Sequence, residues 1–192
     1  IERSYPEGTW LVMMDDDIEA VDKLGNEPGE RLVPVRDLEA EVFQPAFAAC
    51  VESGAKFWGI YAARNHYFMK RRIYAGLCYC VGSFFGVIVD HHNALMRQRS
   101  HGEDYEYSLR QYQRNGIVRR MDYITVKSNY YKEEGGLQCF RTPEMMEESI
   151  QWIARRFPGL CKVYHRKNGQ PELRLRDVRK QRKGKAIPFK DI

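Results

Sequence analysis

The apolar residues of this chain occur in short runs that are separated by polar segments. Residues 10–14, 57–62 and 73–90 are apolar runs of strand character, the last interrupted by glycines, and residues 120–127 alternate between polar and apolar positions. Both patterns are typical of β-strands. Between them we expect helices over residues 37–50, 103–116 and 142–157. Strands and helices therefore alternate, which predicts an α/β fold.

The expected helices begin and end at residues that suit those positions. Asp37 can cap the first helix, although Pro45 must kink or restart it. The second helix carries acidic residues in its first turn, where the helix dipole favours them, and Gly116 ends it. Thr142 and Pro143 open the third helix, because threonine is a good cap and proline suits the first helical position.

The N-terminal part of the chain yields two further expectations. The run from Trp10 to Met14 is apolar on both faces, which predicts a central strand in a sheet that is covered on both sides. Residues 22–34 are polar and rich in glycine and proline, so we expect an exposed loop there.

Composition narrows the class of protein. Hydrophobic residues make up 43% of the 192 residues and charged residues 30%, as in a globular domain with a core. No apolar stretch can span a bilayer and no signal-peptide pattern is present, so we expect a soluble, intracellular protein without a membrane partner. The five cysteines lack zinc-site spacing, which favours buried free thiols in a reducing compartment. The first residue is Ile1 rather than Met, which indicates a piece of a longer protein.

The net charge of +5 is unevenly distributed along the chain. Residues 1–60 lean acidic, whereas residues 64–72 and 155–190 are basic. Such asymmetry favours a polyanionic partner, of which nucleic acid is the commonest. A basic tail that is only solvated would give the same pattern.

Three consecutive aspartates, Asp15, Asp16 and Asp17, directly follow the first apolar run. A strand that ends in carboxylates places them at its C-terminal edge, where ligands bind in open α/β sheets. Carboxylates this close repel one another unless a cation lies between them, and their oxygens suit Mg2+ or Mn2+, which a diphosphate would share. We therefore expect a metal site; a solvated turn or a helix N-cap is the alternative.

Glu103 and Asp104 form a second acidic pair, at the start of the expected helix 103–116. A partly desolvated carboxylate that faces a hydroxyl group can act as a general base. Asp104 is the candidate base, and Glu103 either orients it or points elsewhere. Simple N-capping and the helix dipole would explain the same pair.

Paired glycines supply weaker candidates for ligand binding. Gly82 and Gly86 interrupt an apolar run. Glycines in such a run often mark a place where a ligand approaches the backbone, and a bend needed for packing is the alternative. Gly135 and Gly136 follow two tyrosines in a segment suited to closing over a nucleotide sugar or an extruded base. A plain surface loop is the alternative for this second pair.

The histidines argue against a zinc enzyme. None of the five has the spacing of a zinc site, and the sequence contains neither HExxH nor CxxC. His165 or His101 is the candidate to complete a divalent-metal site, although a lone histidine is more often simply packed or exposed. GxSxG, Walker A and GxGxxG motifs are also absent, which disfavours hydrolase, P-loop and Rossmann functions.

Six segments follow one another in an order that resembles a family-2-type glycosyltransferase of GT-A fold. More narrowly, the order is similar to that of the branch associated with TET/JBP-type thymine and cytosine hydroxylases. Each motif is weak alone, but the ordered set spans most of the chain. The matching segments are 14–17, 58–61 with Asn65, 82–86, 103–108, 130–131 with 135–138, and 172–176.

This resemblance implies a metal-dependent, inverting transfer of a sugar from a nucleotide sugar such as UDP-glucose. The expected acceptor is 5-hydroxymethyluracil or 5-hydroxymethylcytosine in DNA. Asp15 and Asp17, with His165 as a candidate, would bind Mn2+ or Mg2+, and Asp104 would deprotonate the acceptor hydroxyl. The expected donor-binding residues are Asp16, Gly82, Gly86, Gly135 and Gly136, and the expected acceptor or nucleic-acid-binding residues are Arg64, Asn65, Tyr130, Tyr131, Arg174 and Arg176.

The same resemblance implies a GT-A-like mixed sheet flanked by helices. Residues 1–176 would form the catalytic domain, as the C-terminal portion of a GT-A fold, and residues 177–192 a basic tail. Only 14 residues precede Asp15, so we expect the N-terminal nucleotide-binding part to be incomplete. The expected location is the cytoplasm of an infected host cell, or the nucleus in a eukaryote.

Two other functions stay open at this point. A degenerate transferase-like module could bind nucleic acid or a protein without catalysis, and salt-sensitive DNA binding without metal or UDP would identify it. A nuclease or phosphotransferase could use both acidic clusters, but it would need two metals within about 4 Å. The absence of a lysine or histidine beside either cluster makes the second function the weaker one.

Overall fold

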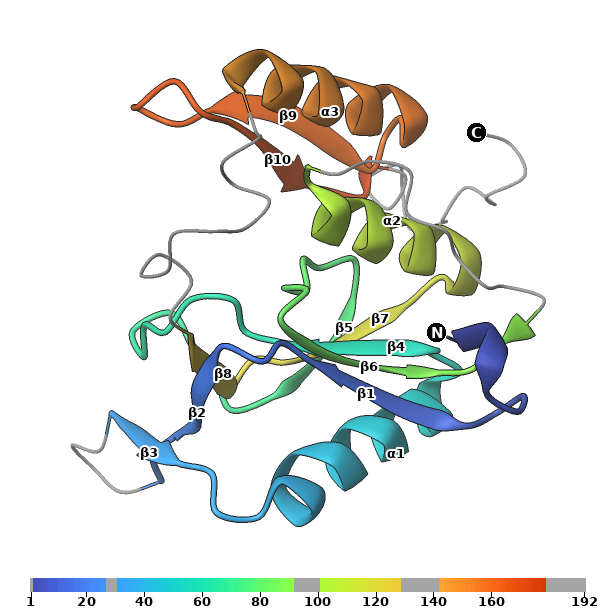
Figure 1. The fold of residues 1–192 in the computed structure, drawn as a ribbon, viewed down its shortest axis with the longest axis vertical. Helices are drawn as coiled ribbons and strands as arrows, with labels where there is room; N and C mark the ends of the chain where they lie inside the picture. Colours follow the sequence, from blue (N-terminus) through green and yellow to red (C-terminus); the bar gives the residue numbers. More distant parts are fainter. Residues whose placement is uncertain (1, 27–30, 92–100, 129–141, 179–192) are drawn as a thin grey trace.

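A computed structural model describes residues 2–26, 31–91, 101–128 and 142–178, and it shows a mixed α/β fold in which helices lie on both faces of a five-stranded sheet (Figure 1). The helical elements are η1 (Glu2–Ser4), the π-helical turn η2 (Glu39–Phe43), α1 (Gln44–Ser53), α2 (Glu103–Asn115) and α3 (Pro143–Arg156). The strands are β1 (Trp10–Met14), β2 (Ile18–Leu24), β3 (Leu32–Pro34), β4 (Phe57–Ile60), β5 (Ile73–Gly76), β6 (Phe84–Ile88), β7 (Val118–Met121), β8 (Ile124–Ser128), β9 (Cys161–His165) and β10 (Pro171–Leu175).

The main sheet has the strand order β1-β6-β4-β7-β5. Strand β6 is antiparallel to both β1 and β4, whereas β4 and β7 are parallel and β5 is antiparallel to β7. Strands β1, β4 and β7 therefore run in the same direction and reach their carboxyl ends at one edge of the sheet. The segments that follow these three strands meet at that edge.

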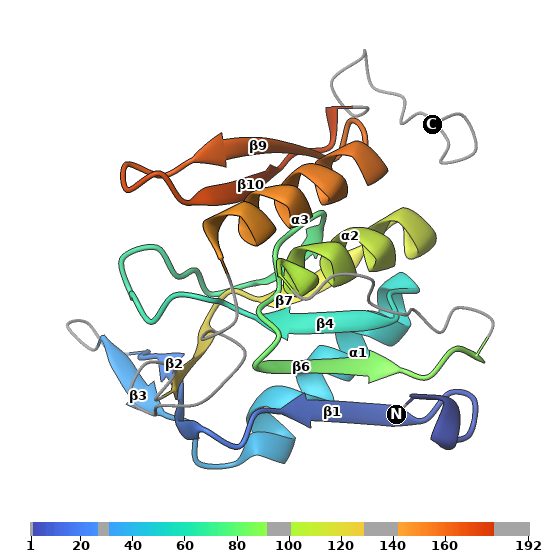
Figure 2. The same cartoon turned by 45° about the horizontal axis from the view of Figure 1, so that its top comes forward.

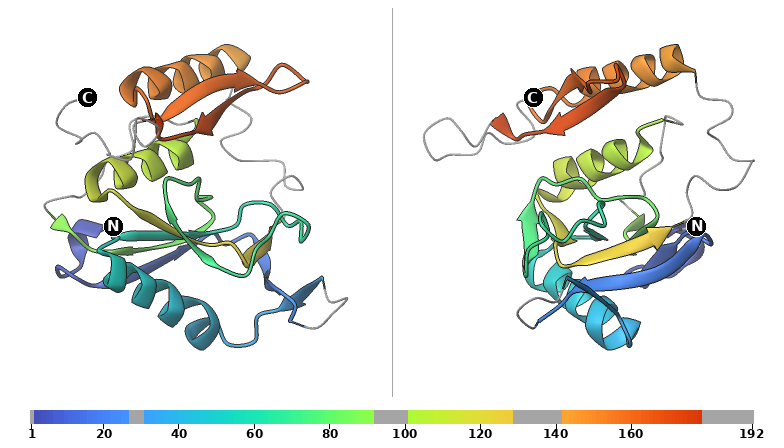
Figure 3. Two further views of the ribbon diagram at one scale, coloured as in Figure 1. Left: turned by 180° about the vertical axis from the view of Figure 1, so that it is seen from behind. Right: turned by 90° about the vertical axis from the view of Figure 1, so that its left-hand side faces the viewer.

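Helices α1 and α2 lie on opposite faces of the main sheet, and α3 with the β9–β10 hairpin lies beyond α2 (Figure 2). Neighbouring residues of a strand point to opposite faces. Accordingly, Trp58 and Phe84 pack in the cluster on the α1 side, whereas Phe57 and Phe85 pack in the cluster on the α2 side. The two further views agree on this layering (Figure 3).

Two smaller sheets complete the fold. Strand β2 pairs with β3 on one side and with β8 on the other, and β9 forms a hairpin with β10. The four cysteines of the described part are buried and free, and Cys139 lies outside it. Within residues 2–26, 31–91, 101–128 and 142–178, no helix is both long and apolar enough to cross a membrane.

Three helix boundaries expected from the sequence are confirmed. The Thr142 side chain accepts a hydrogen bond from the Met145 N–H at 3.3 Å and so caps α3. Gly116 ends α2 with a φ of 73°, a left-handed conformation that glycine adopts without strain. Pro45 lies in the first turn of α1, directly after η2, so the helix restarts there.

Two expectations about the N-terminal region are wrong. Strand β1 is an edge strand rather than a central one, and Trp10 is 51% exposed. Its residues are apolar on both faces because Leu11 and Val12 contact the two different core clusters, one on each side of the sheet. Residues 22–34 are also more than a loop, since they contain the end of β2 and all of β3.

The single strand expected over residues 120–127 differs from the structure. Residues 120–127 belong to two strands, because a turn at Asp122 separates β7 from β8. The packed part of the chain continues past residue 176, since the Val178 N–H donates to the Gly159 carbonyl at 3.0 Å and Tyr112 Oη donates to Asp177 Oδ2 at 2.5 Å. Residues 179–192, most of the expected tail, lie outside the described residues.

Candidate functional site

Three of the sequence motifs meet at the carboxyl edge of β1. The Asp15 N–H donates to the Ser83 carbonyl at 2.9 Å, which ties the start of the aspartate run to the segment that precedes β6. Gly82, the next residue back, lies against the Asp104 carboxylate at the start of α2, because a β-carbon at Gly82 would be 2.2 Å from Asp104 Oδ1. The structure therefore brings together the aspartate run, the glycine segment and the Glu103–Asp104 pair.

The surroundings of Asp104 suit an oriented carboxylate. Tyr79 Oη donates to Asp104 Oδ2 at 3.1 Å, and the Tyr79 ring lies against the Tyr105 ring with centroids 4.4 Å apart. Burial raises the pKa of Tyr79 well above 10, and the negative charge of Asp104 raises it further. Tyr79 therefore stays protonated and donates this bond at any ordinary pH. Glu103 is the first residue of α2 and is only partly buried.

Asp17 is the member of the aspartate run with a feature that fits a cation. Its Oδ2 accepts a hydrogen bond from Ser128 Oγ at 2.8 Å, whereas its Oδ1 is buried and has no hydrogen-bond partner among the described residues. A buried carboxylate oxygen without a donor is unfavourable unless a cation binds it. Asp15 and Asp16 are exposed.

A divalent metal at this edge would have few protein ligands. No three histidine, cysteine or acidic side chains gather as a metal group within the residues that the structure describes. Two aspartates still fit Mg2+, which proteins commonly hold through one or two carboxylates together with substrate phosphates and water. The donor set therefore suits a metal that a diphosphate shares.

His165 does not join this edge. It ends β9, on the far side of α2 from β1, and its Nε2 lies 2.8 Å from Glu147 Oε2 on α3. His101, the other candidate, lies two residues before α2, and its Nδ1 is buried without a hydrogen bond among the described residues.

The other residues expected to bind the sugar donor or the acceptor do not all lie at this edge of the sheet. Gly86 is in the middle of β6, where a β-carbon would be 2.3 Å from the Trp58 indole, so core packing explains this glycine. Arg176 is exposed after β10, and its N–H donates to the Leu160 carbonyl. The remaining expected residues, Tyr130, Tyr131, Gly135 and Gly136, lie outside the described residues.

Residues 61–72, which follow β4 at the same edge, form a loop that its own charged groups hold in place. Arg64 forms an ion pair of 2.7 Å with Asp22, and Arg72 one of 2.8 Å with Asp122; both aspartates are buried. The Asn65 side-chain carbonyl accepts the Tyr67 N–H at 3.1 Å and so stabilises a turn. Arg64 and Asn65 therefore have structural partners in addition to any binding role.

The same loop exposes two adjacent aromatic side chains. Tyr67 is 79% exposed and Phe68 is 66% exposed, the two highest values among the large apolar residues of the described part. The His66 ring lies against Tyr67, with centroids 4.2 Å apart, and Lys70 is exposed nearby in the sequence. Aromatic rings interleaved with basic residues are typical of surfaces that bind single-stranded nucleic acid.

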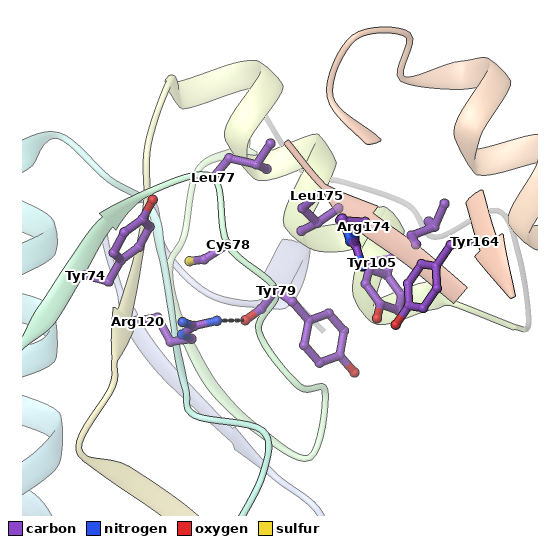
Figure 4. A pocket seen from close by; sticks show the side chains of 10 residues that line it. Tyr74, Leu77, Cys78, Tyr79, Tyr105, Arg120, Tyr164, Arg174 and Leu175 are labelled. Carbon is purple, nitrogen blue, oxygen red and sulfur yellow. Dashed lines mark hydrogen bonds between the residues drawn. The ribbon is translucent and has the colours of Figure 1, made fainter. Parts of the chain in front are cut away.

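A cavity of about 430 Å³ lies between the main sheet and the β9–β10 hairpin (Figure 4). The sheet contributes Tyr74 from β5 and Arg120 from β7, whereas the hairpin contributes Tyr164 and Arg174. Its lining also includes Leu77, Cys78, Tyr79, Tyr105, Leu173 and Leu175. Sequence reasoning identified only Arg174 of this set, because residues far apart in the chain form the walls.

The two arginines of the cavity differ in their bonding. Arg120 Nε donates to Asp122 Oδ1 at 2.7 Å and its Nη1 to the Tyr79 carbonyl at 3.0 Å, so the protein already holds this guanidinium. The Arg174 guanidinium lies 5.2 Å from the centre of the Tyr164 ring and has no ion pair or side-chain hydrogen bond among the described residues. Arg174 therefore offers an available cation at the cavity.

No known family model matches the sequence, and no curated protein or solved structure has significant similarity to the chain.

Proposed function

We propose that this chain is a GT-A-like glycosyltransferase that moves a sugar, glucose from UDP-glucose, onto the hydroxyl group of a hydroxymethylated pyrimidine in DNA. The observation that carries the proposal is the contact chain from Asp15 through Ser83 and Gly82 to Asp104. A transferase of this kind needs a cation-binding carboxylate near its general base, and two sequence-distant acidic motifs here share one sheet edge.

Asp104 has the features of the general base. It lies in the first turn of α2, where the helix dipole stabilises its negative charge, and Tyr79 fixes the direction of one oxygen. In the proposed step the acceptor hydroxyl gives its proton to the Asp104 carboxylate while its oxygen bonds to the anomeric carbon. The bond from that carbon to the diphosphate oxygen breaks, and the electron pair leaves with the nucleoside diphosphate. Attack opposite the leaving group inverts the sugar carbon.

Asp15 and Asp17 are the residues that would hold Mg2+ or Mn2+. The bound ion would offset the negative charge that develops on the departing diphosphate. Ser128 orients the Asp17 carboxylate through its hydroxyl, which leaves Oδ1 for the ion. Removal of either aspartate should therefore weaken diphosphate binding as well as transfer.

Features near the proposed site suit a nucleic-acid acceptor. The exposed Tyr67 and Phe68 offer stacking surfaces, and the Arg174 guanidinium is available for a phosphate. A base in duplex DNA would have to leave the helix to bring its hydroxymethyl group to a carboxylate on the protein.

The test is a transfer assay with Mn2+ and labelled UDP-glucose. DNA containing 5-hydroxymethyluracil, 5-hydroxymethylcytosine or only ordinary bases is offered, and the nucleosides are analysed by mass. We expect hexose on one modified base only, and loss of this product in Asp104→Asn. Glu52→Gln, which removes an exposed carboxylate from α1 on the opposite face of the sheet, should transfer normally. Normal transfer by Asp104→Asn would refute the role of Asp104, and no transfer to any DNA by the parent would refute the function.

A second candidate is a module that binds nucleic acid without catalysis. The observation that favours it is the rigidly anchored loop 61–72 with its exposed aromatic pair, since this surface needs neither metal nor nucleotide sugar. Tight, salt-sensitive DNA binding in a chelator, combined with no transfer to any DNA, would support this candidate over the enzyme. A two-metal nuclease gains no support, because the described residues contain no group of three metal ligands.

A further inference from the structure

We propose that the cavity between the main sheet and the β9–β10 hairpin binds a single nucleotide of the acceptor strand, with the base against tyrosine rings and the phosphate on Arg174. That this cavity is the acceptor pocket rests on the proposed transferase function. That the cavity binds a nucleotide is independent of that function, because it follows from the lining of the cavity alone.

The walls of the cavity suit a flat aromatic ring. Tyr74 and Tyr164 come from two different sheets and lie on different sides of the cavity in Figure 4, and Tyr105 lies beside Tyr164. Base–tyrosine stacking stabilises binding for any base, because every base presents a π-face. Leucine side chains add apolar surface to the lining. A volume of about 430 Å³ is at the small end of the range for ligand pockets, which suits one nucleotide rather than several.

Arg174 supplies the positive charge that a nucleotide requires. It is exposed, it contacts the Tyr164 ring, and it makes no ion pair among the described residues. Arg120, by contrast, is held by Asp122 and by the Tyr79 carbonyl. A guanidinium stacked on an aromatic ring and otherwise unpaired is well placed to bind a phosphate next to a stacked base.

Tyr79 connects this cavity to the proposed general base. Its side chain lines the cavity, and its hydroxyl donates to Asp104 Oδ2 at 3.1 Å. Tyr79 therefore borders both the cavity and the Asp104 carboxylate. In the proposed site the nucleotide lies in the cavity while its hydroxymethyl group extends past the Tyr79 ring to reach Asp104.

The test measures equilibrium binding to the full chain by titration calorimetry, without metal or nucleotide sugar. The probes are 5-hydroxymethyl-2′-deoxyuridine 5′-monophosphate, the matching nucleoside and 2-deoxyribose 5-phosphate. We expect the nucleotide to bind more tightly than either part. Arg174→Gln should weaken the nucleotide about tenfold and leave the nucleoside unchanged, whereas Tyr164→Leu should weaken both about tenfold. Lys167→Gln, which removes the same charge from the exposed turn between β9 and β10, should have little effect.

Matched variants distinguish the contribution of the Tyr164 ring from that of its hydroxyl group and from a loss of folding. Tyr164→Phe keeps the ring but loses the bond to Glu172, so it should bind nearly as the parent does. If Tyr164→Leu does not fold, as judged by thermal unfolding, Tyr74→Leu and Tyr74→Phe form the replacement pair on the opposite wall. No binding of the nucleotide by the parent, or equal losses in Arg174→Gln and Lys167→Gln, would overturn the proposal.

The same variants distinguish failure of the nucleotide-pocket proposal from failure of the proposed transferase function. Nucleotide binding that depends on Tyr164 and Arg174, without any sugar transfer, would leave the pocket standing and refute the enzyme. Transfer with an unchanged KM for the oligonucleotide in both variants would support the enzyme and overturn the pocket.

Discussion

Gly82 and Asp104, 22 positions apart in the sequence, are in such close contact that no side chain could stand between them. A β-carbon at Gly82 would lie 2.2 Å from Asp104 Oδ1 and 3.0 Å from its Cγ. The absence of a side chain at residue 82 therefore sets the position of the carboxylate. Together with the Tyr79 hydroxyl, the Gly82 backbone confines Asp104 from two directions.

Gly82→Ala should displace Asp104 and reduce sugar transfer about 100-fold, since a shift of about 1 Å at a reacting group can cost that much. We expect a smaller effect on stability, about 1–3 kcal/mol of unfolding free energy, as for other overpacked sites. Transfer rates and thermal unfolding measure the two effects. If the effect passes through Asp104, the double variant with Asp104→Asn should be no slower than Asp104→Asn alone; additive losses would contradict this account.

Asp17→Asn should abolish the stabilisation of the protein by Mn2+ in the presence of UDP. The reason is that Oδ1 is buried, has no hydrogen-bond donor among the described residues, and would lose its negative charge. Ser128→Ala, which removes only the orienting hydroxyl, should weaken Mn2+ binding about 10–100-fold. Thermal unfolding across a Mn2+ titration measures both. An unchanged response in Asp17→Asn would show that the ion binds elsewhere.

Tyr67→Ala and Phe68→Ala should each weaken binding of single-stranded DNA by about 1–3 kcal/mol while leaving the unfolding temperature unchanged. Their side chains are largely exposed, so folding gains little from them, whereas a stacked base would lose its partner. Fluorescence anisotropy with a labelled oligonucleotide measures the affinity. Val51→Ala on α1 is the control, because it removes an exposed apolar side chain from a different surface. Equal affinities in all three variants would exclude the loop from DNA binding.

Glu172→Gln should destabilise the protein near neutral pH, and the difference from the parent should shrink in acid. Hydrogen bonds from Arg166, and then from Tyr164 and Tyr105, hold the pKa of Glu172 below its ordinary 4.5. A lowered pKa in the folded state contributes stability that is fully present above pH 4.5 and is lost as the pH falls through the lowered value. Urea unfolding between pH 7 and acid measures this. A difference that stays constant with pH would show that the hydrogen bonds do not depend on the charge of Glu172.

Local signals predicted the helices well. Thr142, Pro45 and Gly116 act through the backbone of their own or adjacent turns, so the sequence around each of them contains the information that matters. Strand order could not be predicted in this way, because it depends on pairing with strands that are distant in the sequence. The run 10–14 is apolar on both faces whether it lies at the edge or in the centre, provided that helices cover both sides of the sheet.

The same distinction applies to the candidate site. The acidic motifs could be identified because several carboxylates stand together in the sequence. That Gly82 contacts Asp104 depends on the packing of α2 against the sheet, which no local pattern encodes. The polar neighbours of Asp22 predict a loop, whereas its burial depends on an ion pair with Arg64, 42 positions away. Residue type alone makes His165 a candidate metal ligand, and its contact is with Glu147.

The two walls of the tyrosine-lined cavity are distant in the sequence, which has a consequence for the order in which they form during translation. Tyr74 and Arg174 are 100 positions apart, so the wall on the main sheet leaves the ribosome long before the wall on the hairpin. Chains fold from the N-terminal part first as they emerge. A nascent chain can thus form the aspartate edge while the cavity still lacks its hairpin wall, and the cavity is complete only when residues 171–175 have been translated and paired with β9.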